Sequence, residues 1–241
     1  MIDVEEGRIE MKEIDILANF EREINMIDNA VDKPSTDDSL FWLNQAVGKF
    51  TKERFNGDLV HRTSYEQNEK RRTDLIKLFK SKSYEGSDFD YTNEQPSYDQ
   101  YGIKYPEDFL FSLNEDVVIS DMDGDHKMDT CMFECTQDSF MYRITNSLTD
   151  FHYRYHRARP LRIRNVDGCE LLTDKNYKIH KYTLGYLRKP KEITLEKPFE
   201  EYTDFEDIIM SEIIKIAAQM YLENKKDERY KTISYEVNTQ E

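Results

Sequence analysis

Two cysteines and two histidines stand in the order of a zinc-finger ligand set. Cys131 and Cys135 are four residues apart, as are His152 and His156, and 16 residues separate the two pairs. Zinc fingers place about 12 residues between their pairs, and the rest of that pattern is missing here. Cys131 and Cys135 also share one face of a predicted strand with Phe133, where a thiol behaves as a small apolar group. We therefore expect no zinc site.

Residues 121–125 (DMDGD) look like the beginning of a calcium-binding loop, whose first, third and fifth positions supply oxygen ligands. The sixth position requires glycine but is His126, and the twelfth requires a bidentate glutamate but is Met132. The alternative is a β-hairpin turn, for which an Asp-Gly pair is typical because glycine accepts a positive φ. The sequence favours the hairpin and predicts neither a metal nor a cofactor.

Motifs typical of enzymes are missing from the sequence. It contains no G-x-S-x-G, no G-x-x-x-x-G-K and no G-x-G-x-x-G. The five histidines are scattered among charged and aromatic residues, and acidic pairs such as Glu107 and Asp108 arise by chance in a chain with 49 carboxylates. A hydrolase built on such a pair is the enzymatic alternative. We expect the chain not to be an enzyme.

One basic segment runs against the charge of the whole chain. Residues 139–166 contain six arginines and one acid, Asp150, with Phe151, Tyr153 and Tyr155 between them. Planar guanidinium groups in this setting suit contacts with carboxylates, phosphates and aromatic rings. Three interpretations stay open: a solvated face balanced by acids of the same chain, contact with an acidic second copy, and contact with phosphate. The six arginines are Arg143, Arg154, Arg157, Arg159, Arg162 and Arg164.

The composition limits the class of protein. The formal net charge of −15 and the pI of about 4.9 argue against a protein that coats DNA or membranes. Hydrophobic residues make up 38% and aromatic residues 12%, which indicates a folded chain with modest cores. The three cysteines show no disulfide framework and favour a reducing, cytoplasmic site of synthesis. No run of 18 apolar residues is present, so we expect no membrane-spanning segment.

Helical periodicity is strongest towards the two ends of the chain. Apolar residues recur three or four apart in residues 11–27, 36–56, 63–79 and 203–221. The last two of these helices begin with capping boxes, in which Thr63 pairs with Glu66 and Thr203 with Glu206. In the first helix the expected apolar stripe consists of Ile14, Leu17, Ala18, Ile24 and Ile27.

The middle of the chain is predicted to be rich in strands. Residues 81–105 show neither period and are predicted to run over the surface. Residues 117–119 pair with 130–136 as one hairpin, and residues 171–172 with 177–187 as a second. The order of helices, strands and a last helix predicts an α+β fold, in which an N-terminal helical bundle is completed by the C-terminal helix and a β-rich insertion lies between them.

Three domains follow from this order. Residues 1–80 plus 200–228 are predicted to form the helical bundle, and residues 81–199 the β-rich insertion. Residues 229–241 are predicted to be an extended C-terminal tail that adds a strand to a neighbour's sheet edge. The tail residues expected to make this contact are Tyr230, Ile233, Tyr235 and Val237.

Several short runs of the sequence together resemble a known family. These runs are SLFWLNQA at 39–46, FTKERFNG at 50–57, SYEQNEKR at 64–71, YPEDFL at 105–110 and LGYLRKP at 184–190. Together they resemble the connector ring proteins of crAss-like tailed phages, of the ring protein 1 type, and more distantly the head-to-tail adaptors of short-tailed phages. The predicted C-terminal helix also lies where that family has an amphipathic helix.

The resemblance implies a virion structural protein that forms a ring of twelve copies in the head-to-tail connector. It further implies that the ring joins the portal protein to other connector or tail proteins, surrounds a channel through which DNA passes, and assembles in the host cytoplasm without a membrane. In such a ring, carboxylates facing the channel repel phosphate, and the arginines or the tail contact neighbouring subunits or the portal. The alternative is an accessory nucleic-acid-binding module that uses arginines 143–164.

Overall fold

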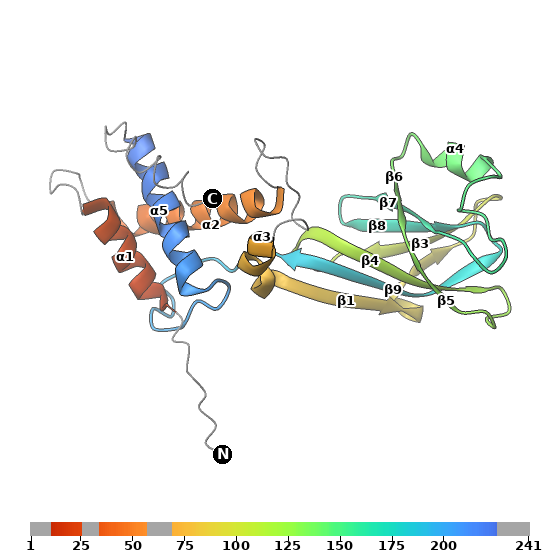
Figure 1. Cartoon of the computed structure of the whole chain (residues 1–241), viewed down its shortest axis with the longest axis horizontal. Coiled ribbons are helices and arrows are strands. Elements are labelled where there is room, and N and C mark those ends of the chain that lie inside the picture. Colours follow the sequence, from red (N-terminus) through yellow and green to blue (C-terminus); the bar gives the residue numbers. More distant parts are fainter. Residues whose placement is uncertain (1–10, 26–33, 57–68, 226–241) are drawn as a thin grey trace, which may run out of the picture. The chain divides into compact units, whose positions relative to one another are not determined.

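The computed structural model describes residues 11–25, 34–56 and 69–225, and the chain divides into two compact units (Figure 1). One, here called the helical unit, is formed by Met1–Leu78 together with Pro190–Glu241. The other, here called the β unit, is Phe79–Lys189. None of the helices in the described residues has the length and apolar character needed to cross a membrane.

In the helical unit, α5 contacts both α1 and α2. Aromatic rings fill the contacts, because Phe20 meets Tyr221 edge to face at 6.4 Å between centroids and Phe50 meets Phe205 at 5.8 Å. α5 begins after its N-cap, Glu206, and therefore later than the predicted start at Thr203. The elements are α1 (Glu13–Asn25), α2 (Thr36–Asn56), α3 (Glu69–Asp74), the 3-10 helix η2 (Ile76–Leu78) and α5 (Asp207–Asn224).

The first helix buries a different stripe from the one predicted. Ile16, Phe20 and Ile24 are buried, whereas Ile14 is 38% exposed. Both stripes have helical spacing, but the observed one contains an aromatic ring, which removes more apolar surface from water than an aliphatic side chain does. Local periodicity therefore located α1 and one of its buried residues, Ile24, but missed Ile16 and Phe20, and the predicted Ile27 lies outside the described residues.

A buried arginine joins three helices of the helical unit. The Nε atom of Arg54 in α2 lies 3.1 Å from Oδ2 of Asp74 in α3, and its NH2 atom lies 2.8 Å from Oε2 of Glu212 in α5. Its guanidinium also lies 4.8 Å from the centroid of the Phe50 ring. Burial raises the pKa of Asp74, against the opposing effect of Arg54. Arg54 is buried on the inner face of α2.

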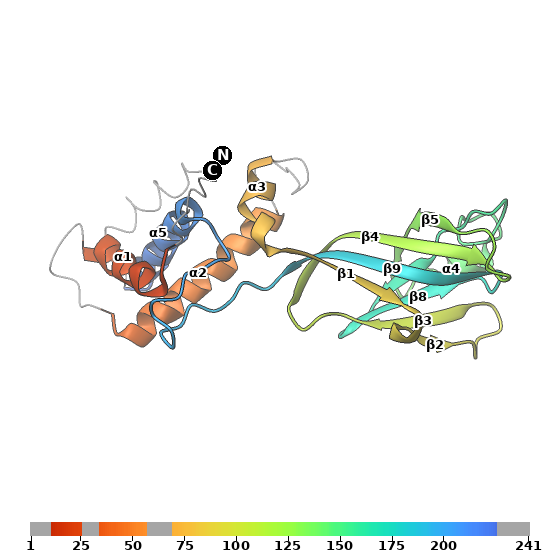
Figure 2. The ribbon, with the colours of Figure 1, turned by 90° about the horizontal axis from the view of Figure 1, so that it is seen from below.

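The β unit is built from two sheets whose strands form one shared core (Figures 1 and 2). The first sheet has the order β1-β9-β4-β5, and the second has the order β2-β3-β8-β7-β6. Every pair is antiparallel except β6 with β7. The strands are β1 (Phe79–Glu85), β2 (Asp90–Thr92), β3 (Asp99–Lys104), β4 (Phe109–Asp121), β5 (Met128–Cys131), β6 (Phe133–Cys135), β7 (Leu161–Arg164), β8 (Gly168–Thr173) and β9 (Tyr177–Arg188).

The shared core is rich in tyrosine. Tyr182 of β9 is fully buried and lies 5.8 Å, centroid to centroid, from Tyr84 of β1. Tyr101 and Leu171 reach the same cluster from the second sheet. Because side chains from both sheets interdigitate here, the β unit is a sandwich. A second, smaller cluster around Phe151 packs on the other face of the second sheet.

The predicted fold class is wrong. The described residues form nine strands in two sheets and only five α-helices, so the chain is β-rich and not an N-terminal helical bundle carrying a β insertion. The main omission is residues 81–105, where β1, β2 and β3 replace the predicted surface excursion. β1 lies at a sheet edge and buries only Tyr84, so its sequence carries no alternation that could reveal a strand. The predicted domain boundaries stay a prediction.

The predicted strand pairings are correct in one case and wrong in the other. β4 and β5 form the expected hairpin, and Gly124 in its turn has a φ of +88°. The chain changes sheet after Cys131, however, which leaves Cys131 exposed and Cys135 buried. β8 and β9 follow each other in the sequence but belong to different sheets, so they do not pair. Their connection crosses the sandwich.

An ion pair near the end of the first sheet predicts a small effect of acid on stability. Asp108 accepts hydrogen bonds from Lys80 Nζ at 2.6 Å and Tyr186 Oη at 3.0 Å. Partial burial acts to raise the pKa of Asp108, but these hydrogen bonds outweigh it and hold the pKa below its ordinary value. The pair therefore contributes stability above the unfolded pKa of about 4, and this contribution is lost as the pH falls through the folded value.

We expect Asp108→Asn to lower the free energy of unfolding by less than about 1 kcal/mol at pH 6, since half of the Lys80 side chain is exposed. The difference from the unmodified protein should shrink at pH 3. Urea unfolding at both pH values measures it, with Asp129→Asn on exposed β5 as the control. A difference that grows on acidification would contradict the assignment.

Candidate functional site

An exposed surface that combines apolar side chains with arginine lies on one segment of the β unit. We call it the 141–157 surface. Tyr142, Leu148 and Tyr155 are 70%, 85% and 93% exposed. Met141 is also exposed, and Arg154 and Arg157 lie in the same segment. Tyrosine, methionine and arginine are enriched in protein interfaces and at their energetic centres, so this surface has the composition of a binding site.

The 141–157 surface is held in place by a buried anchor and by backbone hydrogen bonds. It begins in α4 (Phe140–Thr145), and the fully buried Phe151 fixes its centre in the smaller core cluster. Thr149 Oγ1 donates to the carbonyl oxygen of Arg143 at 2.8 Å, and the guanidinium of Arg154 donates to the carbonyl oxygen of Ser147. The exposed side chains are therefore presented from an ordered loop, which lowers the entropy lost on binding.

A tight turn projects Tyr155 into solvent. The backbone N–H groups of Arg154 and Arg157 each donate to the other residue's carbonyl oxygen at 2.9 Å. Between them, Tyr155 and His156 have φ values of +50° and +60°. Left-handed backbone of this kind costs about 1–2 kcal/mol per residue for amino acids other than glycine. Glycine would adopt this backbone conformation without that cost. The presence of Tyr155 and His156 instead indicates that their side chains have a role at this turn.

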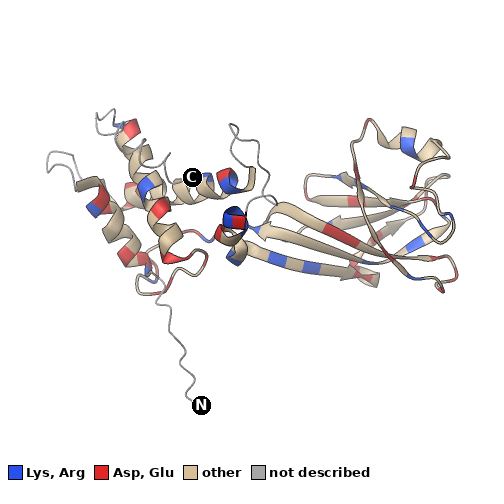
Figure 3. Cartoon of the chain, viewed as in Figure 1, with Lys and Arg blue, Asp and Glu red and all other residues tan. Residues whose placement is uncertain are grey.

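The six predicted contact arginines do not form one patch. Arg154 and Arg157 are exposed in the turn, and Arg159 lies 3.5 Å from the carboxylate of Asp150. Arg143 packs its guanidinium 3.5 Å from the centroid of the Phe133 ring, and Arg164 lies 5.7 Å from that of Phe109. Basic and acidic positions are interspersed over the strands and loops of the β unit (Figure 3).

Arg162 has an internal role. It is buried, and its guanidinium contacts Glu115 Oε1 at 2.5 Å and Glu134 Oε1 at 2.7 Å. Glu115 belongs to β4 in the first sheet and Arg162 to β7 in the second, so this ion pair links the two sheets. Burial raises the pKa of Glu115, which Arg162 opposes. The guanidinium is committed to the sandwich rather than presented to a partner.

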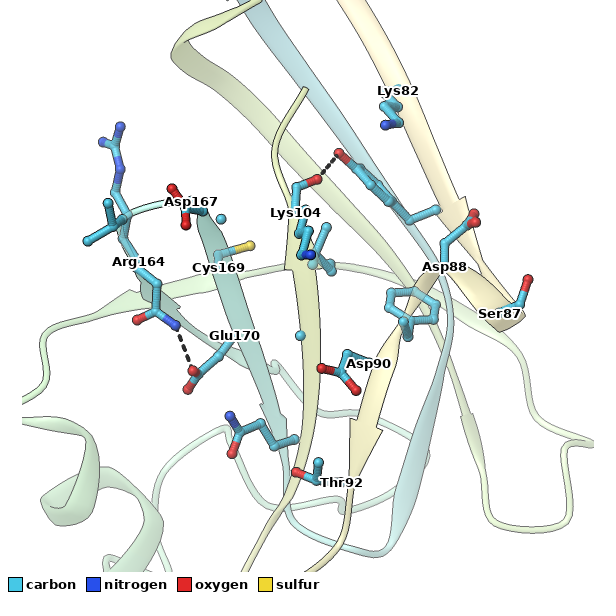
Figure 4. A pocket seen from close by; sticks show the side chains of 18 of the residues that line it. Lys82, Ser87, Asp88, Asp90, Thr92, Lys104, Arg164, Asp167, Cys169 and Glu170 are labelled. Carbon is cyan, nitrogen blue, oxygen red and sulfur yellow. Dashed lines mark hydrogen bonds between the residues drawn. The ribbon is translucent and has the colours of Figure 1, made fainter. Parts of the chain in front are cut away.

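An open groove of about 1230 Å³ runs along β3 and β8 beside β1 and β2 (Figure 4). Its charged lining residues carry both signs. Burial raises the pKa of the Cys169 thiol in this groove to about 11, so the thiol is protonated at neutral pH and is a poor nucleophile. The groove therefore suits binding rather than covalent chemistry. The charged residues are Lys82, Asp88, Asp90, Lys104, Arg164, Asp167 and Glu170.

The cysteine and histidine pairs considered as zinc ligands are dispersed. Cys135 Sγ lies 3.2 Å from Ser139 Oγ, and His152 Nδ1 lies 3.7 Å from an oxygen of Asp174. In the described residues one group of three potential ligands lies close together, and it combines His156 with Asp121 and His126. Sequence spacing missed this group because 30 residues separate the hairpin turn from His156. The tail residues Tyr230, Ile233, Tyr235 and Val237 lie outside the described residues.

Residues 12–201 match the family model of phage tail ring protein 3/4, a family named for crAss phages. The chain belongs to this family. The match covers most of the sequence and includes every described helix and strand except α5. None of the curated proteins matches the chain.

Membership of this family makes the chain a phage structural protein of the ring type. The prediction of a virion ring protein is confirmed at that level, and a structural family agrees with the expectation that the chain is not an enzyme. The prediction of ring protein 1 is corrected to ring protein 3/4, and the similarity to short-tailed phage adaptors is not supported. The resemblance depended on the order of short runs, none of which distinguishes one ring from another.

Proposed function

We propose that this tail ring protein associates with copies of itself through the 141–157 surface. The supporting observation is that three large side chains of this surface, Tyr142, Leu148 and Tyr155, are each at least 70% exposed. Side chains of this size are expected to be covered in the working state of the protein, because burying each would contribute about 1.5–3 kcal/mol. The family supports the ring as the form of assembly.

Charge supports a copy of the same chain as the partner. The chain carries a formal net charge of −15, and Arg154 and Arg157 stand out from it on an exposed turn. An acidic surface of a neighbouring copy would complement these arginines, whereas repulsion opposes association between acidic surfaces. In a head-to-tail ring each subunit uses two different surfaces, so a basic patch on one can meet an acidic patch on the next.

The helical unit offers a second set of exposed apolar side chains. Phe41 of α2 is 53% exposed, and Ile208 of α5 is 75% exposed. We propose that these residues contact other ring or tail proteins.

We also propose that the assembly contains twelve copies, joins the portal to the tail and surrounds the DNA channel. The surplus of carboxylates supports this placement, since acidic walls repel phosphate and let DNA slide.

The test is the assembly state of variants, measured by native mass spectrometry and negative-stain microscopy with and without a purified portal ring. We expect the unmodified chain to form rings, and Tyr155→Ser with Arg157→Glu to weaken each subunit contact by at least about 30-fold, as for interface hot spots. Val166→Ser is the matched control, because Val166 is 99% exposed on a different loop. Rings of unchanged stability in the double variant would contradict the proposed surface.

The alternative, a nucleic-acid-binding module, is distinguished with the same proteins. It predicts binding to duplex DNA that weakens steeply with salt and disappears when Arg154, Arg157 and Arg159 are replaced by alanine. Arg162 is internal and cannot contribute to that binding without unfolding the sandwich. Salt-dependent DNA binding together with undisturbed rings in the arginine variants would favour the alternative.

A further inference from the structure

Three metal-binding side chains meet at one end of the β unit. Asp121 and His126 come from the turn between β4 and β5, and His156 comes from the tight turn that projects Tyr155. Each offers one ligand atom, and these atoms all lie within 4.8 Å of one another. Two imidazoles and a carboxylate from separate loops form a donor set typical of transition-metal sites rather than a cluster of like charges.

The local structure aims these donors at a common point. Asp121 Oδ1 accepts hydrogen bonds from the backbone N–H groups of Gly124 and Asp125, both at 2.9 Å. Oδ2 of the same carboxylate then faces His126, whose Nδ1 lies 2.7 Å away. The ring of His156 stacks on the ring of His126 with 4.0 Å between centroids. Asp121 is thus oriented by its own turn, and its Oδ2 is directed at His126.

The second histidine is also oriented by a neighbour. The hydroxyl of Tyr153 lies 3.4 Å from Nδ1 of His156. Hydrogen-bonding partners of this kind commonly fix the ring and the tautomer of a metal-binding histidine. His156 itself has a left-handed backbone, which directs its side chain from the turn. Strained backbone of this sort is concentrated at functional sites.

We propose that Asp121, His126 and His156 bind one divalent transition-metal ion, of which Zn²⁺ is the type. Imidazole favours Zn²⁺, Co²⁺ and Ni²⁺, whereas Mg²⁺ and Ca²⁺ prefer shells of oxygen ligands. Bonds of about 2.0–2.1 Å in a tetrahedral site place ligand atoms about 3.4 Å apart. Reaching that spacing requires the imidazoles of His126 and His156 to rotate, since His126 Nδ1 now lies 2.7 Å from Asp121 Oδ2 and the three ligand atoms lie within 4.8 Å of one another. An ion bound there would replace the hydrogen bond between His126 and Asp121.

Such an ion would join the turn between β4 and β5 to the turn that carries Tyr155. It would hold the turn that carries Tyr155 against the β4–β5 hairpin, and its three protein ligands leave a fourth position for water. The site is complete within one chain. The inference therefore stands or fails independently of ring formation.

The experiment uses the full-length protein with Cys131→Ser, which removes the exposed thiol as a competing ligand. After treatment with a chelator, Zn²⁺ is titrated by calorimetry, and Co²⁺ is added to record the visible absorption of a tetrahedral site. We expect one ion per chain, and an affinity at least about tenfold lower in His126→Gln and in His156→Gln. The matched controls are His180→Gln and Asp125→Asn, whose side chains are not in the ligand group.

The possible outcomes separate clearly. Binding by the starting protein that is weakened in both ligand variants, and retained in both controls, supports the site. An increase in the melting temperature with Zn²⁺ that vanishes in the same two variants supports it further. Lack of Zn²⁺ binding by the starting protein overturns the proposal, as does equal binding in His126→Gln or His156→Gln. Preference for Ca²⁺ over Zn²⁺ also overturns it.

Discussion

Replacing Arg162 by alanine is expected to lower the free energy of unfolding of the β unit by about 3–5 kcal/mol. The guanidinium lies between Glu115 and Glu134 inside the protein, at 2.5 and 2.7 Å from their oxygens. Removing it leaves the carboxylate of Glu115, whose side chain is only 11% exposed, in a poorly solvated site without its counter-ion. The pair also links the two sheets, so its loss weakens the contact between them.

Chemical denaturation followed by circular dichroism measures this effect, and Arg164→Ala provides a control on the same strand. Arg164 is exposed and its guanidinium lies 5.7 Å from the centroid of the Phe109 ring, so its removal should cost no more than about 1 kcal/mol. The double variant Arg162→Met with Glu115→Gln should recover part of the loss, because no unpaired charge then stays buried. Equal losses for Arg162→Ala and Arg164→Ala would show that Arg162 is not the structural arginine.

Arg162 also shows why the sequence could indicate the chemistry of the arginine segment but not the position of each arginine. Arg162 and Arg164 are two residues apart, as side chains on the same face of a strand are. The sequence alone therefore suggests that both belong to one basic patch. In the structure β7 lies inside its sheet. Arg162 faces Glu115 of the other sheet, whereas Arg164 reaches the end of its own sheet. Burial of a charge depends on a partner distant in sequence, which local spacing does not reveal.

The same distinction explains which parts of the fold were predictable. α2 has a long apolar stripe and begins after Ser35, whose Oγ accepts a hydrogen bond from the N–H of Asp38. Both the stripe and the cap are formed by residues close together in the sequence. β1 depends on pairing with β9 about 100 residues later, and β8 and β9 are assigned to different sheets by packing alone. The long helices α1, α2 and α5 were therefore located from local periodicity, whereas α4, the edge strands and sheet membership were not; of the predicted helix 63–79 the described residues form only α3 and η2 before β1 begins at Phe79.

The candidate site shows both cases. Arg154, Arg157 and Tyr155 of the 141–157 surface were visible in the sequence as part of a basic, aromatic segment in an acidic chain. The group of Asp121, His126 and His156 was not visible, since it forms only when two turns meet at one end of the sandwich. Asp121 stands in a run that resembles the start of a calcium-binding loop, and His156 stands in one half of a zinc-finger-like order, but neither pattern joins these three residues.

At two glycines of the β unit an added Cβ atom would clash, but with different kinds of neighbour. We therefore expect alanine to be much more destabilising at Gly168 than at Gly185. A Cβ atom on Gly168 would lie 1.8 Å from the carbonyl oxygen of Ile103 and 2.9 Å from its carbon. These are backbone atoms of β3, the strand with which β8 pairs. Relief requires the two strands to separate, which breaks ladder hydrogen bonds in the centre of the second sheet. We expect Gly168→Ala to cost at least about 3 kcal/mol.

A Cβ atom on Gly185 would lie 1.9 Å from Oδ1 of Asn114, which is the end of a side chain. Asn114 lies opposite Gly185 at a register shift in β4, and its amide can rotate away at the loss of one exposed hydrogen bond to Asp116. We therefore expect Gly185→Ala to cost only about 1 kcal/mol. Urea unfolding of the two variants compares them directly. The expected difference arises because Gly168 is close to backbone atoms and Gly185 to a movable side chain. Equal destabilisation by Gly185→Ala and Gly168→Ala would contradict this explanation.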